Sequence, residues 1–375
     1  MSESLHDEPS LLKLAADGDQ AAFGELTGAY RAELRAHCYR MLGSVHDAED
    51  ALQEALLRAW RNLAQFEGRG SVRSWLYSIA TNSALDITRH RSRREFPVDF
   101  SPAADAGTEL GAPQTELPWL EPFPDQWPTA EPEELYEQRE SLELAFVVAL
   151  QHLPPLQRAA LLLREVLGFS TVEIAGQLDT SAASVNSALQ RARATTRGLL
   201  PSQTQQSTLR LLGDQRTRAL VERYADAMER HDVGTLISML TEDATWSMPP
   251  HSRWYRGHEA IRQFLLRYPL TERWRHRPLL VNGQLGLACY MWDATQDRYF
   301  AAGIDVLTLR GEKISAIVGF LAAKTLKLPD TGGWITGAEM FSRFGQPVVF
   351  DEHSPVPAAI PLDAPVTPEP IVPPA

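Results

Sequence analysis

The distribution of proline divides this chain into parts. Of the 26 prolines in 375 residues, eight lie within residues 96–135 and eight within the last 25 residues. The first cluster also holds nine Asp and Glu and no Lys or Arg, and such a segment favours extended conformations and repels itself. We therefore predict an acidic Pro-rich linker over 96–134 and a disordered Pro-rich tail over 346–375. Folded units are predicted over 1–95, 135–202 and 203–345.

Composition excludes several classes of protein. Hydrophobic residues make up 44% of the chain and charged residues 22%, which is near the globular average and excludes wholesale disorder. No stretch approaches the about 20 consecutive apolar residues of a membrane-spanning helix, and the acidic N-terminus lacks the apolar core of a secretory signal. Cys38 and Cys289 are too few for a disulfide framework or a four-cysteine zinc site. We therefore expect a cytoplasmic chain with no metal, no cofactor and no membrane partner.

The first block is predicted to contain an acidic amphipathic helix. Over residues 47–63, apolar side chains follow the three-to-four spacing of a buried helical stripe. At 100° per residue, the opposite face and its flank carry acids and one glutamine. These residues are Asp47, Asp50, Gln53 and Glu54.

A basic helix is predicted directly after the acidic one. Ser71 is suited to cap its N-terminus, and the helix is predicted over 72–94. Between residues 69 and 94 there are six arginines and a single acid. Three residues spaced seven apart project from one flank of this helix, namely Trp75, Asn82 and Arg89. The first block therefore presents two surfaces of opposite charge.

The second block ends in a helix-turn-helix pattern. A short helix is predicted over 170–178, Asp179 and Thr180 break it, and a second helix is predicted over 182–198 with Gly198 as its C-cap. The second helix buries an apolar stripe and turns a polar face outward, as a helix that reads the major groove requires. That face comprises Asn186, Ser187, Gln190, Arg191, Arg193 and Arg197.

The third block changes from helices to strands. Helical patterns end near residue 268, and four strand-like segments follow from about residue 273. Asn282-Gly283 and the Arg-Gly-Glu at 310–312 are typical of hairpin turns. Helices followed by antiparallel strands predict an α+β unit in which the sheet wraps the helices.

Three segments of the sequence together resemble a known family. DAEDALQEALLRAW, FEGRGSVRSWLYSIATNSALD and LPPLQRAALLLREVLGFSTVEIAGQL resemble an extracytoplasmic-function (ECF) sigma factor of bacterial RNA polymerase, and the remainder resembles a SnoaL-like domain. The chain is most similar to the sigma-G-like group. The resemblance implies a multidomain protein with two all-α sigma domains, a helical bundle and a helix-turn-helix, followed by a C-terminal α+β cone-shaped barrel.

The resemblance also implies partners and their binding residues. Bacterial RNA polymerase core enzyme is expected to bind the acidic helix, and promoter DNA is expected to bind the basic helix as a single-stranded minus-ten element and the second helix-turn-helix as a minus-thirty-five duplex. The implied polymerase-binding residues are Asp47, Glu49, Asp50, Gln53 and Glu54. The implied DNA-binding residues are Arg69, Arg73, Trp75, Asn82, Arg89, Arg91, Arg93, Arg94, Asn186, Ser187, Gln190, Arg191, Arg193 and Arg197.

Two interpretations of the linker remain open. In the family, this segment threads the active-site cleft and RNA exit path of the polymerase, and its nine acids would mimic the charge of RNA. A plain flexible tether between two DNA-binding modules is the alternative.

Aromatic residues are frequent in the third block, as in domains that enclose a ligand pocket. We expect no catalytic residues there, and the unit is predicted to regulate, either by docking onto the sigma domains of the same chain or by holding a small-molecule ligand. Ionisable residues that could reach a pocket include His276 and Asp293. The candidate pocket residues are Asp243, Trp246, His258, Trp292 and Asp305.

We predict that the chain directs core polymerase to specific promoters and is not an enzyme. The first alternative is a ligand-responsive helix-turn-helix regulator that does not act through core polymerase, and it leaves the acidic and basic helices of the first block without a role. The second alternative is an enzyme that also binds DNA.

Overall fold

The computed structural model of this chain describes residues 7–66, 68, 70–125, 138–328 and 334–351. It divides into two compact units. We call residues 1–94 and 145–200 the first unit, and residues 95–144 and 201–375 the second unit.

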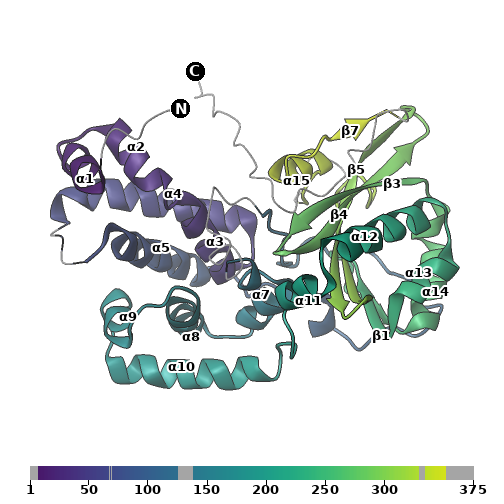
Figure 1. Ribbon diagram of the computed structural model, residues 1–375, viewed down its shortest axis with the longest axis horizontal. Coiled ribbons are helices and arrows are strands. Elements are labelled where there is room, and N and C mark those ends of the chain that lie inside the picture. Colours follow the sequence, from purple (N-terminus) through teal and green to yellow (C-terminus); the bar gives the residue numbers. More distant parts are fainter. Residues whose placement is uncertain (1–6, 67, 69, 126–137, 329–333, 352–375) are drawn as a thin grey trace. The chain divides into compact units, whose positions relative to one another are not determined.

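The first unit consists of helices joined by short turns (Figure 1). Polar side chains begin most of them: Ser44 and Ser71 each accept a hydrogen bond from the backbone N–H three residues later, and Ser170 does so in a capping box with Glu173. The α-helices are α1 (Glu8–Ala16), α2 (Gln20–Gly28), α3 (Arg31–Leu42), α4 (Val45–Asn62), α5 (Val72–Thr88), α7 (Leu144–Gln151), α8 (Pro155–Leu161), α9 (Thr171–Gln177) and α10 (Ala182–Arg197).

The basic helix is shorter than predicted. Helix α5 ends at Thr88, so the expectation of a helix as far as Arg94 is wrong. The next residues turn, and Arg91 and Arg94 form ion pairs with Asp47 on α4. A helix rises about 1.5 Å per residue, so a continuous helix would carry these arginines away from Asp47. The sequence pattern alone does not contain this long-range contact.

A buried arginine joins the two sequence segments of the first unit. Arg158 is 4% exposed and donates hydrogen bonds to the carbonyl oxygens of Met41, Gln151 and Leu153. Two of these carbonyls lie at the C-terminal ends of α3 and α7, where the helix dipole favours a cation. Burial lowers the pKa of Arg158 to about 10, so the side chain stays charged at neutral pH.

The second unit packs helices against one curved sheet. The helices are α11 (Gln205–Leu212), α12 (Asp214–Glu229), α13 (Val233–Met239), α14 (His258–Arg267) and α15 (Gly337–Arg343). The strands are β1 (Leu240–Ser247), β2 (Trp254–Arg256), β3 (Trp274–Val281), β4 (Gln284–Asp293), β5 (Arg298–Arg310), β6 (Lys313–Leu321) and β7 (Val349–Phe350). The strands follow the order β2-β1-β6-β5-β4-β3, with β7 paired to β5, and β1 runs parallel to β6 while the other pairs are antiparallel.

The predicted α+β architecture is confirmed, and the sheet is open because its outer strands β2 and β3 do not pair with each other. Helices α12, α13 and α14 cover one face of the sheet (Figure 1). The hydrophobic core lies between these helices and the sheet, around Tyr224, Phe264 and Leu307. The β3–β4 hairpin turns at Asn282 and Gly283, both with positive φ.

The predicted linker includes residues that pack as part of the second unit. Trp119 and Phe123 are 2% and 1% exposed. The N–H of Phe123 donates to Asn282 Oδ1 at 2.8 Å, and the N–H of Asn282 donates back to the Phe123 carbonyl at 2.9 Å. The N–H of Ala104 donates to the carbonyl of Trp254 at 2.8 Å. Residues 95–125 therefore pack as part of the second unit, and they include a short 3-10 helix at Pro97–Asp99.

We predict that Gly283→Ala destabilises the second unit more than Gly311→Ala does. Both glycines close hairpins with positive φ, +66° and +62°. A Cβ at Gly283 would lie 2.9 Å from the carbonyl carbon of Arg139, whereas a Cβ at Gly311 meets nothing within 4 Å. The strained φ costs each variant about 1–3 kcal/mol, and the collision adds at least about 1 kcal/mol for the first.

Chemical denaturation followed by tryptophan fluorescence measures this difference, since seven of the nine tryptophans belong to the second unit. Equal destabilisation of the two variants would contradict the packing of residue 139 on this hairpin.

We also predict that Glu143→Gln makes the second unit more stable, relative to the wild type, as the pH rises from 5 to 8. Glu143 accepts a hydrogen bond from the N–H of Gln206 at 2.8 Å, and burial raises its pKa from 4.5 to about 7. Over this window the unfolded carboxyl loses its proton before the folded one does, so the wild type loses stability. The glutamine does not titrate.

Between pH 5 and pH 8, the free energy of unfolding of the variant is expected to rise relative to that of the wild type by up to about 3 kcal/mol, since each unit of pKa shift corresponds to about 1.4 kcal/mol. Urea titrations at several pH values measure it. A difference that stays constant with pH would contradict the buried, protonated carboxyl.

Candidate nucleic-acid interface and cavity

The acidic residues of α4 divide into exposed and buried groups. Asp50 is exposed, with 48% of its side chain accessible, and its Oδ2 lies 3.7 Å from His46 Nε2. Gln53 is also exposed. Glu54 is partly exposed and accepts a hydrogen bond from Arg58 at 2.7 Å, while Glu49 lies 3.5 Å from Arg35. An exposed acidic face therefore exists at Glu49, Asp50, Gln53 and Glu54.

Asp47 lies apart from that exposed face. Its side chain is 2% accessible and forms ion pairs with Arg91 and Arg94. Arg94 is itself largely buried, with 13% of its side chain accessible, while Arg91 is about half exposed. The structure thus brings together one residue predicted to bind polymerase and two predicted to bind DNA.

The other predicted residues of the minus-ten surface have neighbours within the first unit. Arg73 donates to Glu33 at 3.1 Å, Trp75 packs against Phe66 with ring centroids 5.1 Å apart, and Arg89 pairs with Asp86 at 2.9 Å. Arg93 lies 2.9 Å from His152, and Arg69 lies outside the described residues.

The predicted recognition helix is α10. Val185, Leu189 and Ala192 are buried, as the sequence spacing predicts. The six predicted DNA-binding residues of this helix are all exposed. Arg193 forms an ion pair with Glu165, and the Ser187 hydroxyl donates to the Ala183 carbonyl at 3.0 Å. A polar, arginine-bearing face on a helix that follows a short helix and a tight turn is suited to the major groove.

Helices α5 and α9 contact each other inside the first unit. Asn82 Nδ2 donates to the Gln177 carbonyl at 3.3 Å, and Gln177 Nε2 donates to the Ser74 hydroxyl at 3.2 Å. Asn82 is a predicted base-contacting residue, so in this arrangement α9 covers part of the predicted minus-ten surface.

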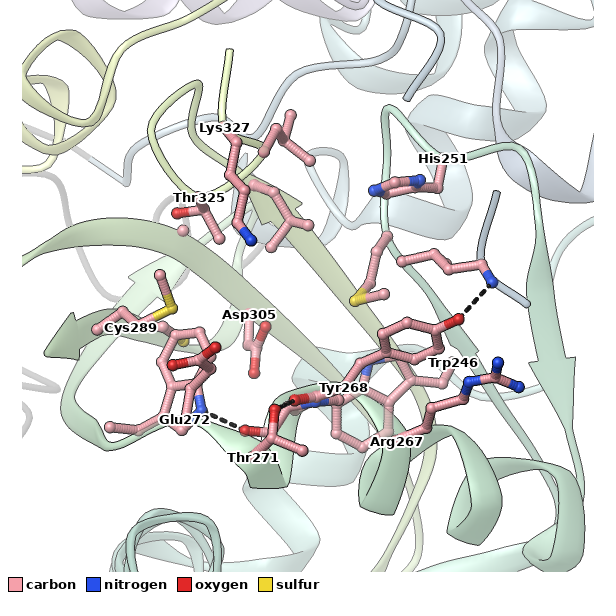
Figure 2. A pocket seen from close by; sticks show the side chains of 18 of the residues that line it. Trp246, His251, Arg267, Tyr268, Thr271, Glu272, Cys289, Asp305, Thr325 and Lys327 are labelled. Atoms are coloured by element: carbon pink, nitrogen blue, oxygen red, sulfur yellow. Dashed lines mark hydrogen bonds between the residues drawn. The ribbon is translucent and has the colours of Figure 1, made fainter. Parts of the chain in front are cut away.

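The second unit contains a cavity of about 620 Å³ between α14, the sheet and the 109–112 segment. Figure 2 shows its polar side chains, with Asp305 at the centre. Its apolar lining comes from the helices, the strands and the loop after β6, and comprises Leu110, Met228, Trp246, Met248, Trp274, Met291, Leu321 and Leu326.

Asp305 and His276 form the polar part of this cavity. The Tyr224 hydroxyl donates to Asp305 Oδ2 at 3.0 Å, and burial raises the pKa of Asp305 above its ordinary value of 3.8. The His276 side chain is fully buried, and its Nδ1 lies 3.6 Å from Glu229 Oε1. Nδ1 of His276 is the atom paired with Glu229, whereas Nε2 has no hydrogen-bond partner among the described residues.

The structure places the five predicted pocket residues in different environments. Trp246 and Asp305 line the cavity. Asp243 is exposed and pairs with Arg310, His258 Nε2 lies 3.4 Å from the Leu240 carbonyl oxygen, and Trp292 packs on Tyr299 with ring centroids 4.9 Å apart. None of these three is among the residues that line the cavity.

The alternation of side chains along a strand explains why two of these three residues lie outside the cavity. Asp243 is three residues from Trp246 on β1, and Trp292 is one residue from Met291 on β4, so each faces away from the cavity. Asp293, another ionisable residue that sequence reasoning considered, pairs with Lys324 at 2.6 Å. His276 does line the cavity.

Sequence reasoning missed the contribution of residues 109–112. Tyr268 Oη accepts a hydrogen bond from the Leu110 N–H at 3.0 Å, drawn as a dashed line in Figure 2. Arg267 donates to Glu109 at 2.7 Å and to the Gly107 carbonyl at 3.1 Å. The predicted linker therefore forms one wall of the cavity.

The described residues form neither a cluster suited to a metal ion nor a helix suited to crossing a membrane. No three His, Cys, Asp or Glu side chains converge in the described ranges to hold a metal ion. None of the described helices combines the length and apolar character that crossing a lipid bilayer requires.

Three segments of the chain match known protein families. Residues 26–94 match the Sigma-70 region 2 family, residues 143–195 match Sigma-70, region 4, and residues 221–317 match the SnoaL-like domain family. The crystal structure of the extracytoplasmic-function sigma factor SigJ from Mycobacterium tuberculosis has a similar fold, with a TM-score of 0.51 at 23% identity over 81% of this chain and 98% of that chain.

Similarity in sequence identifies the family more directly than similarity in fold does. The ECF RNA polymerase sigma factor SigG of Mycobacterium tuberculosis H37Rv is 41% identical over 312 residues, covering 82% of this chain and 83% of SigG. The ECF RNA polymerase sigma-E factor of Escherichia coli K12 is 32% identical over 193 residues, covering 52% of this chain and 93% of that protein. The chain therefore belongs to the ECF RNA polymerase sigma factor family and carries a SnoaL-like domain after its two sigma regions.

Proposed function

We propose that this chain binds bacterial core RNA polymerase through the exposed acidic face of α4 and promoter DNA through α5, the arginines after it and α10. It selects promoters and performs no covalent chemistry itself, and it acts in the cytoplasm, where the polymerase works. The observation that carries the proposal is the exposed polar face of α10, which follows a capped helix and a tight turn in the same unit as the acidic face.

The predicted domains take separate roles in this proposal. Residues 1–95 bind core polymerase and the minus-ten element, and residues 135–202 bind the minus-thirty-five duplex. Residues 203–345 regulate these activities. The packing of 95–125 on the second unit supports a role for the segment beyond that of a tether.

Binding of DNA by Arg91 and Arg94 requires new partners for Asp47. The carboxylate is buried, and its attraction to both arginines offsets the cost of removing it from water. If DNA phosphates take these arginines, the Asp47 carboxylate loses its partners. It must then be hydrated or pair with a basic side chain of the polymerase. We therefore place Asp47 as a residue that positions the arginines, with Asp50 as the direct contact to polymerase.

We predict that Asp50→Arg weakens binding to core polymerase at least tenfold. The substitution puts like charges opposite each other in the proposed contact, and such a juxtaposition costs several kcal/mol. Asp17→Arg is the matched control, because Asp17 is an exposed acid outside the acidic face. Titration of bacterial core polymerase with each labelled variant gives the dissociation constants. Wild-type affinity in Asp50→Arg would remove this face from the contact.

We predict that two kinds of change on α10 have different effects on promoter binding. Asn186→Ala with Gln190→Ala removes amides that can pair with base edges, so selectivity falls while the salt dependence is kept. Arg191→Ala removes a phosphate contact, so affinity falls on all sequences and the salt slope decreases by about one. Thr195→Ala, on the flank of the exposed face, leaves both unchanged.

Holoenzyme binding to promoter and scrambled duplexes at several salt concentrations measures both effects. If the double variant keeps full selectivity, α10 is not the reading helix.

A further inference from the structure

We propose that a small cavity of the first unit binds the diphosphate group of a small molecule, with Arg91, Arg93 and Arg158 as its main contacts. This cavity is lined by the end of α5, the segment that follows it and the loop that joins α7 to α8. Binding of the diphosphate does not depend on the proposed function, and only its regulatory consequence, given below, rests on it.

Positive charge dominates the lining of this cavity. Its volume is about 320 Å³, near the lower end of the range of ligand sites. With His152 neutral, the lining contains four arginines and one aspartate, which leaves an excess of three positive charges. A cleft lined by charge of one sign focuses the electric field and concentrates ions of the opposite sign, so the cavity favours a small anion. The four arginines are Arg91, Arg93, Arg94 and Arg158.

The arginines keep donors for an anion although two of them pair with Asp47. A guanidinium carries five N–H donors, so one carboxylate shared by Arg91 and Arg94 cannot occupy all of theirs. The side chain of Arg91 is 49% accessible. Arg93 is exposed, and its Nη1 lies 2.9 Å from His152 Nδ1 in the α7–α8 loop. Arginine donors therefore reach the cavity from the segment after α5.

A buried cation with one remaining donor contributes to the opposite wall. Arg158 is 4% exposed, and its two terminal nitrogens donate to backbone carbonyl oxygens and to the Gln151 side chain. Its Nε has no hydrogen-bond partner among the described residues. Burial and, after it, the charge of Arg93 lower the pKa of Arg158 to about 10. An anion near these two arginines would offset their repulsion and supply a hydrogen-bond acceptor.

The charge and the donor type favour a diphosphate over other anions. The planar guanidinium of arginine matches phosphate oxygens with two parallel N–H···O bonds. A single phosphate ester carries about −1.5 to −2 charges at pH 7, which is less than the excess charge of the lining. Two linked phosphates come closer to compensating that excess, and Ser92 adds a hydroxyl to the lining.

Occupancy of this cavity would regulate DNA binding, and this step rests on the proposed function. There, the arginines after α5 bind promoter DNA. A diphosphate bound to Arg91 and Arg93 takes up donors that the DNA phosphates need, so the two ligands compete. Each therefore weakens the binding of the other by the same factor, as linkage requires.

Isothermal titration calorimetry of the full chain at constant ionic strength tests the site with four probes: inorganic pyrophosphate, orthophosphate, citrate and a short single-stranded oligothymidylate. We expect pyrophosphate to bind about tenfold or more tightly than each of the others. Equal binding of citrate would overturn the assignment to phosphate, and equal binding of orthophosphate would overturn the assignment to a diphosphate. Tighter binding of the oligonucleotide would assign the cavity to the DNA backbone and overturn the proposal.

A pair of matched variants locates the site. Arg93→Gln is expected to lower the affinity for pyrophosphate about tenfold, and because Arg93 is exposed, the change leaves the fold intact. Arg61→Gln is the control, since Arg61 is an exposed arginine of α4 outside the cavity lining and is expected to be neutral. Equal affinities of the two variants for pyrophosphate would overturn the assignment of the anion to this cavity.

Competition in the holoenzyme tests the regulatory step. With no nucleotides present, pyrophosphate at ten times its dissociation constant and constant free Mg²⁺ is expected to weaken binding of a labelled minus-ten single strand about tenfold. Arg93→Gln is expected to remove most of this effect. Unchanged strand binding would overturn the regulatory step. If the holoenzyme binds no strand at all, the proposed function fails, whereas the calorimetry, which involves neither polymerase nor promoter, stands or falls independently.

Discussion

The buried carboxylate of Asp47 determines how the charged surfaces of the first unit are arranged. It lies on the helix that carries the acidic face, and its ion pairs with Arg91 and Arg94 draw the basic segment after α5 back onto that helix. A buried carboxylate that lost both of its arginines would be an uncompensated charge, which costs about 3–5 kcal/mol. The pairs therefore keep the acidic and basic residues next to each other, and the two proposed binding activities share one electrostatic network.

The second unit fixes the position of part of the segment that connects the two sigma regions. Residues 95–125 are acidic and rich in proline, yet they bind the second unit through buried aromatic side chains and backbone hydrogen bonds. The same segment contributes a wall of the cavity.

Much of this architecture could be predicted from local sequence patterns. The buried stripe of α4, the caps at Ser71 and Ser170, the buried residues of α10 and the hairpin at Asn282 and Gly283 all follow from periodicity and turn chemistry, and the structure has them. The end of α5 could not be predicted, because it depends on Asp47, more than 40 residues earlier in the chain. The packing of Phe123 likewise depends on a distant hairpin, which it contacts through Asn282.

The cavity shows the same limit. Sequence reasoning selected Trp246 and Asp305, which line it, together with Asp243 and Trp292, which face the other side of their strands. Alternation along a strand separates the two faces, but it does not say which face is concave until the pairing of the sheet is known. Residues 109–112 belong to a segment with no regular pattern, so nothing local indicated that they form a wall.

Transcription from a defined template by purified bacterial core polymerase, with and without this chain, tests whether the chain selects promoters as part of the polymerase. We expect a promoter-dependent transcript that appears only when the chain is added, and no stable binding of the chain alone to the same duplex. Tight binding of the chain alone to double-stranded operators, together with no transcript and no association with core polymerase, would contradict a role as a polymerase subunit.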